Sequence, residues 1–128
     1  MDRAPFDSAD LQLLQDLALV AAGLAAVDEA DAIASGLQPL QPGRAGPVIA
    51  QALARLNAGR ADDAVQCLAR EPDRADNHEQ AMQQSFLGLA LHLAGRQSDS
   101  RRVLTAAAAH PAGGLARAML GLGAEPAR

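Results

Sequence analysis

The chain has 128 residues, a length that suits one compact domain with a single hydrophobic core. Hydrophobic residues make up 49% of it but aromatic residues only 2%, so the core must consist of Leu, Ala, Val and Ile, a mixture that favours helices over strands. The formal net charge of -4 would repel phosphate backbones, and we therefore expect no binding to nucleic acid.

The compartment is indicated by three further features of the sequence. The single cysteine, Cys67, excludes an internal disulfide and suits a reducing environment. No run reaches the roughly 20 apolar residues that a membrane span needs. The first seven residues do not resemble a signal peptide. We expect a bacterial cytoplasmic protein with no membrane span.

Three long apolar helix patterns end in the same way along the chain. Each closes on an alanine followed by a glycine, at Gly23, Gly59 and Gly95, and these glycines stand 36 residues apart twice over. Glycine just past the last periodic residue is the usual end of a helix, because it adopts the left-handed conformation without a Cβ penalty. A shorter helix then begins behind acidic or hydroxyl residues, which cap its N-terminus. Each unit is therefore predicted to be a helical hairpin.

In chain order the pattern predicts seven helices. Segments that contain Pro and Gly or charged residues, 38–46 and 71–76, connect the hairpins. We expect residues 1–7 to form a flexible N-terminal arm, residues 8–122 a single helical domain and residues 123–128 a frayed tail. The predicted hairpins pair Ser8–Ala22 with Asp28–Leu37, Pro47–Ala58 with Ala61–Arg70, and Asn77–Ala94 with Ser98–Ala109, and a seventh helix, Leu115–Leu122, caps them.

A hairpin in every 36 residues resembles the tetratricopeptide repeat, whose period is about 34. Leu87 and Gly88 match the Leu-Gly pair of that motif. The first unit departs from it, because Asp16 occupies the small position and two extra residues separate Gly23 from Ala30. The resemblance implies an all-α fold of three tetratricopeptide-like hairpins, stacked as a short right-handed solenoid with a C-terminal capping helix.

Residues 8–122 as a whole resemble the tetratricopeptide-like chaperones of bacterial type III secretion, of the YscG and PscG type, which hold the needle subunit before export. The features that carry the resemblance are the segments 13–23 (LLQDLALVAAG) and 28–34 (DEADAIA) and the two-residue excess after Gly23. Related plant-pathogen Hrp secretion proteins share the repeat architecture. The resemblance implies a virulence-associated chaperone that binds the amphipathic helix of a needle subunit in a concave groove and prevents premature polymerisation. It also implies a small helical co-chaperone beside the client.

The residues themselves also indicate a groove. In stacked helical hairpins the first helix of each pair lines the concave side. Placed by the glycine register, these positions are mostly apolar here, and an apolar groove accepts an amphipathic helix through anchors at i, i+3, i+4 and i+7. For any single leucine of the set, packing in the core is an equal alternative. The candidate groove residues are Leu13, Leu17, Val20, Ile49, Leu53, Leu56, Met82, Ser85, Phe86, Leu89, His92 and Leu93.

The first predicted helix is apolar nearly all round, and a terminal helix has a neighbour on one side only. We expect the face around Leu11, Leu14 and Ala18 to bind the co-chaperone or, in the absence of other partners, a second copy of this chain.

No residue set predicts catalysis. The three histidines, His78, His92 and His110, lack the spacing of metal ligands, and the segment 42–47 lacks the Lys-Ser/Thr of a phosphate loop. We expect no enzyme activity, no cofactor and no metal. The alternative function is a tetratricopeptide-like scaffold or structural component of a bacterial secretion apparatus.

Overall fold

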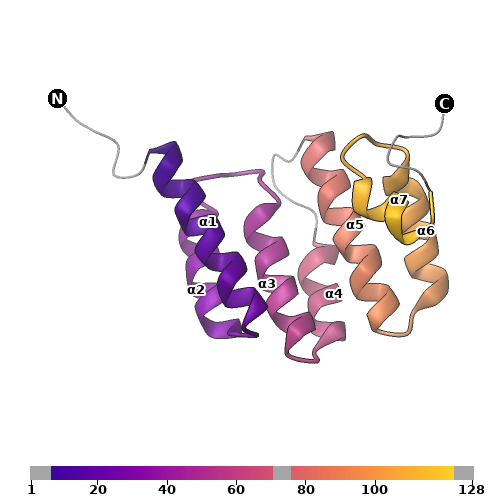
Figure 1. Cartoon of the computed structure of the whole chain (residues 1–128), viewed down its shortest axis with the longest axis horizontal. Coiled ribbons are helices and arrows are strands. Elements are labelled where there is room, and N and C mark those ends of the chain that lie inside the picture. The colour runs from indigo at the N-terminus through magenta and orange to yellow at the C-terminus, as the bar shows by residue number, and fades with distance from the viewer. Residues whose placement is uncertain (1–6, 71–75, 123–128) are drawn as a thin grey trace.

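The computed structural model describes residues 7–70 and 76–122, and these ranges fold into seven α-helices without a strand (Figure 1). The all-α prediction is confirmed. The predicted arm up to residue 6, the tail 123–128 and most of the connector 71–76 lie outside the described residues. The helices are α1 (Ser8–Gly23), α2 (Val27–Leu37), α3 (Gly46–Asn57), α4 (Ala61–Ala69), α5 (Asn77–Leu93), α6 (Gln97–Ala108) and α7 (Gly114–Met119).

The ends of these helices follow the sequence pattern closely. The first six begin and end within one residue of the predicted positions, whereas α7 ends three residues early, at Met119. The side-chain caps expected at α2, α4 and α6 are absent, because the acidic and hydroxyl residues there lie inside the first turn of each helix. Two other starts carry such caps. Asp7 and Asp10 form a capping box at α1, and Asp76 accepts a hydrogen bond from the Glu79 N–H at α5.

The three hairpins succeed one another along the molecule in chain order, and α7 lies against α5 and α6 (Figure 1). Each helix packs on the next, and the first helices of successive pairs also touch, α1 on α3, α3 on α5 and α5 on α7. The largest core cluster joins α3, α4 and α5, and smaller clusters join α1, α2 and α3 at one end and α6 and α7 at the other. Alanine supplies much of this core, so the helices lie close together.

The turn inside each hairpin is built in one way, but the first turn does not use the predicted glycine. Gly59 and Gly95 have φ angles of 77° and 82°, whereas in the first hairpin the left-handed residue is Ala25, with a φ of 58°. In each turn the next residue donates its N–H to the carbonyl five positions back, as from Ala26 to Ala21 at 2.9 Å. Gly23 is the last residue of α1. The prediction that Gly23 is the turn residue is wrong.

This correction shifts the repeat register of the first hairpin by two residues. Counted from Ala25, the small position seven residues before the turn is Ala18, which is fully buried, and not Asp16. The two residues that looked like an excess after Gly23 are Leu24 and Ala25, which belong to the turn itself. The turn residues therefore stand 34 and then 36 residues apart. In all three hairpins the small positions face the interior, namely Ala18, Ala52 and Gly88 seven residues before the turn residue and Ala30, Ala64 and Ser100 five residues after it.

An ion pair holds α3 against the first hairpin. Arg55 donates hydrogen bonds to both carboxylate oxygens of Asp31, at 2.8 Å each, and Gln51 donates to the same carboxylate at 3.2 Å. The hydrogen bonds from Arg55 are the main reason why the pKa of Asp31 lies below its ordinary value. The carboxylate of Asp31 therefore fixes α3 relative to α2.

Candidate helix-binding groove

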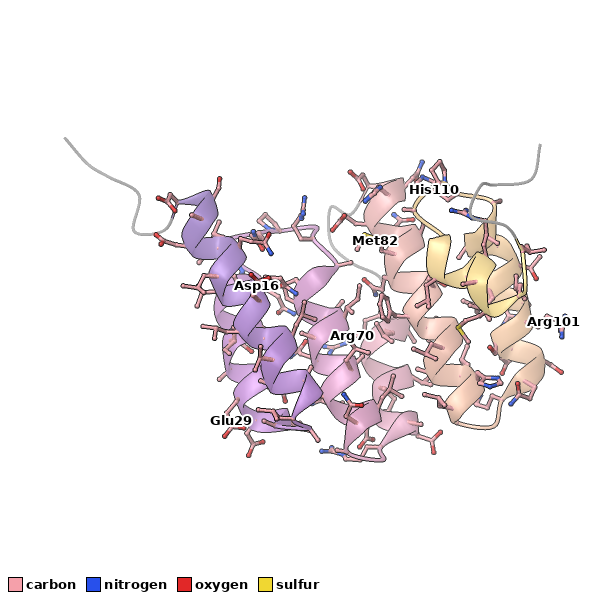
Figure 2. The ribbon with its side chains drawn as sticks, viewed as in Figure 1. Asp16, Glu29, Arg70, Met82, Arg101 and His110 are labelled. Carbon is pink, nitrogen blue, oxygen red and sulfur yellow. The ribbon has the colours of Figure 1, made fainter. Side chains whose placement is uncertain are left out.

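A hollow with a volume of about 550 Å³ runs across the first helices of the three hairpins, α1, α3 and α5. Because these helices touch in series, the hollow continues from one hairpin to the next. Met82, which lines it near the start of α5, is labelled in Figure 2. We call this hollow the groove. Its lining is Gln12, Gln15, Leu19, Gln41, Arg44, Gly46, Pro47, Ile49, Leu53, Asp76, His78, Glu79, Met82 and Phe86.

Four of the predicted groove residues line the hollow, and all four belong to the second and third hairpins. They are Ile49 and Leu53 on α3 and Met82 and Phe86 on α5. Ile49 is only 4% exposed and forms part of the floor, whereas the other three are partly buried. These four side chains belong to the central core cluster or pack against it, and they form an apolar strip in the groove.

The remaining predicted residues of α3 and α5 lie outside the hollow. Leu56 is partly buried and packs against the central core, and Leu89 is also partly buried. His92 and Leu93 are exposed at the other end of α5. Ser85 is buried and donates a hydrogen bond to the Ala81 carbonyl at 2.9 Å, so its place is in the core.

The residues of α1 that face the hollow are not the predicted ones. Leu13, Leu17 and Val20 are 58%, 45% and 58% exposed and do not line it. The error follows from the choice of turn residue. When positions are counted back from Ala25 and not from Gly23, each predicted position moves two residues along the chain, from 13 to Gln15 and from 17 to Leu19. Both of these residues line the hollow. One signal could have revealed this register, because the buried small residue of the second helix stands five positions after the turn residue in every hairpin.

One end of the groove is polar. Glu79 is 7% exposed, accepts a hydrogen bond from the Ala45 N–H at 2.8 Å and lies 3.5 Å from the Arg44 Nε. The Gln15 amide lies flat against Gly46, where a Cβ would come within 2.8 Å of it, so glycine leaves the room that this amide needs. The Gln15 Oε1 is buried and has no hydrogen-bond partner in the described part of the chain. The groove therefore joins an apolar strip to a polar end.

The predicted outer face of α1 is also displaced. Ala18 is fully buried, so the expectation that it contributes to a binding surface is wrong, and Leu11 and Leu14 are half-buried. Ala18 lies inside because it occupies the small position seven residues before the turn residue Ala25. The exposed apolar side chains of this helix outside the groove are Leu13, Leu17 and Val20, and Leu24 follows them at the helix end.

The described ranges contain neither a membrane-spanning helix nor a cluster of metal ligands. None of the helices is both long and apolar enough to cross a membrane. Within residues 7–70 and 76–122, no three His, Cys, Asp or Glu side chains gather in a way that could hold a metal ion.

Comparison of the chain with protein-family models, with curated proteins and with solved structures gave no match.

Proposed function

We propose that this protein is a chaperone of the type III secretion kind, which binds the amphipathic helix of a needle subunit in the groove. The observation that carries the proposal is the groove itself, an apolar strip with a polar end laid across three successive hairpins. A client helix would place apolar side chains on Leu19, Leu53 and Met82. Covering that face of the client would prevent it from polymerising.

The proposed architecture is a short right-handed solenoid of tetratricopeptide-like hairpins. The series of contacts among α1, α3, α5 and α7 and the common turn geometry support it. The same turn recurs after α7, where Gly121 has a φ of 75° and the Leu122 N–H donates to the Arg117 carbonyl at 2.7 Å. In this view α7 stands in the place of the first helix of a fourth hairpin and covers the end of the stack. The side chain of Arg117 donates to the carbonyls of Ala108 and His110, which ties α7 to α6.

We expect the client to be encoded by a gene next to the gene of this chain, so co-expression tests the proposal. The chain is expressed with the products of its adjacent genes, and co-purification of a small helical protein is expected. A co-chaperone in the same complex remains a prediction of the resemblance, and a homodimer in the absence of partners remains a prediction from the apolar character of the first helix. Purification with components of an assembled secretion apparatus instead would support the scaffold alternative.

Two substitutions separate the groove from the rest of the surface. Leu19→Glu places a charge in the groove at a side chain that is 41% exposed, so the fold should tolerate it. Leu93→Glu makes the same change at an exposed leucine of α5 that lies outside the groove. We expect Leu19→Glu to weaken client binding about tenfold or more, because a charge replaces an apolar side chain that the client helix would cover. Leu93→Glu should bind as the unmodified chain does, and equal binding by both variants would contradict the groove assignment.

A further inference from the structure

Four exposed apolar side chains, three on α1 and one directly after its last residue, form a line that we call the α1 stripe: Leu13, Leu17, Val20 and Leu24. Successive members are four, three and four residues apart, a spacing that keeps them on one side of a helix. Leu24 is 75% exposed. The stripe faces away from the groove, which α1 lines with Gln12, Gln15 and Leu19.

The corrected register shows what such positions do elsewhere in the chain. Leu13, Leu17 and Val20 stand twelve, eight and five residues before the turn residue Ala25. The equivalent residues are Pro47, Gln51 and Ala54 in α3, and Gln83, Leu87 and Ala90 in α5.

In α3 and α5 these positions are the contact with the preceding hairpin. Ala54 packs with Ala22 and Ala30 in the cluster that joins α3 to the first hairpin. Gln83 donates hydrogen bonds to the carbonyls of Leu68 and Arg70 at the end of α4, at 3.0 and 2.8 Å. The α1 stripe is therefore the continuation of an interface that the chain already makes twice. Because α1 is the first of the described helices, none of the described hairpins covers its stripe (Figure 1).

The charge around the stripe indicates the kind of helix that would cover it. Residues 7–43 contain six carboxylates and no Lys or Arg. Asp10 and Asp16 are exposed on α1 itself, and Asp28 and Glu29 open α2. A second copy of this chain would bring two such acidic hairpins together, whereas a basic helix would be attracted.

We propose that the α1 stripe binds an amphipathic helix of another protein whose apolar line, with the same four- and three-residue spacing, is flanked by Lys or Arg. This helix completes the end of the stack in the way that α2 and α4 cover α3 and α5. Binding at this surface is independent of the groove and of the function proposed for it.

The direct test uses two synthetic helical peptides that share one leucine line and differ only in its flanks, which are Lys in one and Glu in the other. The full chain is titrated into each peptide, and binding is followed by the fluorescence anisotropy of the peptide. We expect the Lys peptide to bind about tenfold tighter or more, with the advantage shrinking as the salt concentration rises. Equal affinities, or tighter binding of the Glu peptide, would overturn the assigned charge of the partner.

Variants locate the binding surface. Leu17→Glu and Val20→Glu change exposed side chains, so circular dichroism should remain unaltered while the Lys peptide loses about tenfold or more in affinity. Leu19→Glu in the groove and Leu93→Glu on α5 should leave its affinity unchanged. Loss of binding in Leu19→Glu but not in Leu17→Glu would assign the peptide to the groove and overturn the stripe as its site.

Sedimentation tests whether a second copy of the chain covers the stripe instead. Over a range of concentrations the chain alone should remain monomeric. A dimer that Leu17→Glu dissociates would assign the stripe to self-association and overturn the proposal.

Discussion

The first and third hairpins have the same turn and the same crossing, yet they fill the crossing differently. In the third, Gly88 leaves room for Leu104, which lies so close that a Cβ on Gly88 would come within 2.3 Å of its Cδ2. In the first, the equivalent positions hold two alanines, Ala18 and Ala34, both fully buried. One hairpin combines a glycine with a large side chain and the other combines two small ones. The comparison shows that the equivalent positions are buried in both hairpins although the residue types differ.

The largest expected effect breaks the third crossing. Gly88→Val places side-chain atoms where Leu104 Cδ2 and Cγ now lie, and Leu104 is itself 4% exposed. We expect a loss of about 3 kcal/mol in the free energy of unfolding, because overpacking a filled interior forces side chains and backbone apart. Urea denaturation followed by circular dichroism measures it.

The control for this change is the double variant Gly88→Val with Leu104→Ala. Removing the leucine empties the space that the valine needs, so the double variant should be more stable than the sum of the two single losses predicts. Strictly additive losses would show that the two side chains do not compete for one space.

The junctions between hairpins also differ, and the pH dependence of stability distinguishes one junction from the other. The first and second hairpins are joined by the Asp31–Arg55 ion pair, the second and third by the neutral amide of Gln83. We expect Asp31→Asn to cost about 1.5 kcal/mol at neutral pH, since it removes hydrogen bonds between charged groups. Thermal or urea unfolding of both proteins across a pH series checks it.

The pH dependence has a definite sign. Folding lowers the pKa of Asp31, chiefly through the hydrogen bonds from Arg55, so the unfolded chain takes up the proton first as pH falls. The stabilisation is complete above the unfolded value of about 3.9 and is lost as pH falls through the lower value of the folded protein. The stability difference between the unmodified chain and Asp31→Asn should therefore narrow below about pH 4. For Gln83→Leu the difference should stay constant, and a constant difference for Asp31→Asn as well would contradict the role of the ion pair.

The sequence predicted the helices well because their ends carry local signals, such as the glycines at 59 and 95 and the acidic residues at helix starts. It did not predict the first turn, since an alanine in the left-handed region costs about 1 kcal/mol and is rarely found there. That error displaced the predicted groove residues of α1, whereas Leu53 and Met82 were placed correctly. The burial of Glu79 was not predictable, because it depends on a hydrogen bond to Ala45, 34 residues away in the chain.

The smallest effects test the corrected register, and here the first and third hairpins should respond with opposite signs. Gly95→Ala forces an alanine into a φ of 82° and should lower stability by about 1 kcal/mol. Gly23→Ala should instead raise it by about 0.5 kcal/mol, because Gly23 ends α1 with nothing within 4 Å of the added Cβ, and alanine favours the helix. Ala25→Gly should also raise it slightly, since glycine relieves the left-handed strain. The melting temperatures of the three variants show which residue is the turn residue of the first hairpin. If Gly23→Ala lowers the melting temperature as Gly95→Ala does, then Gly23 is the turn residue after all, and the equivalence of the α1 stripe to the buried faces of α3 and α5 is lost with it.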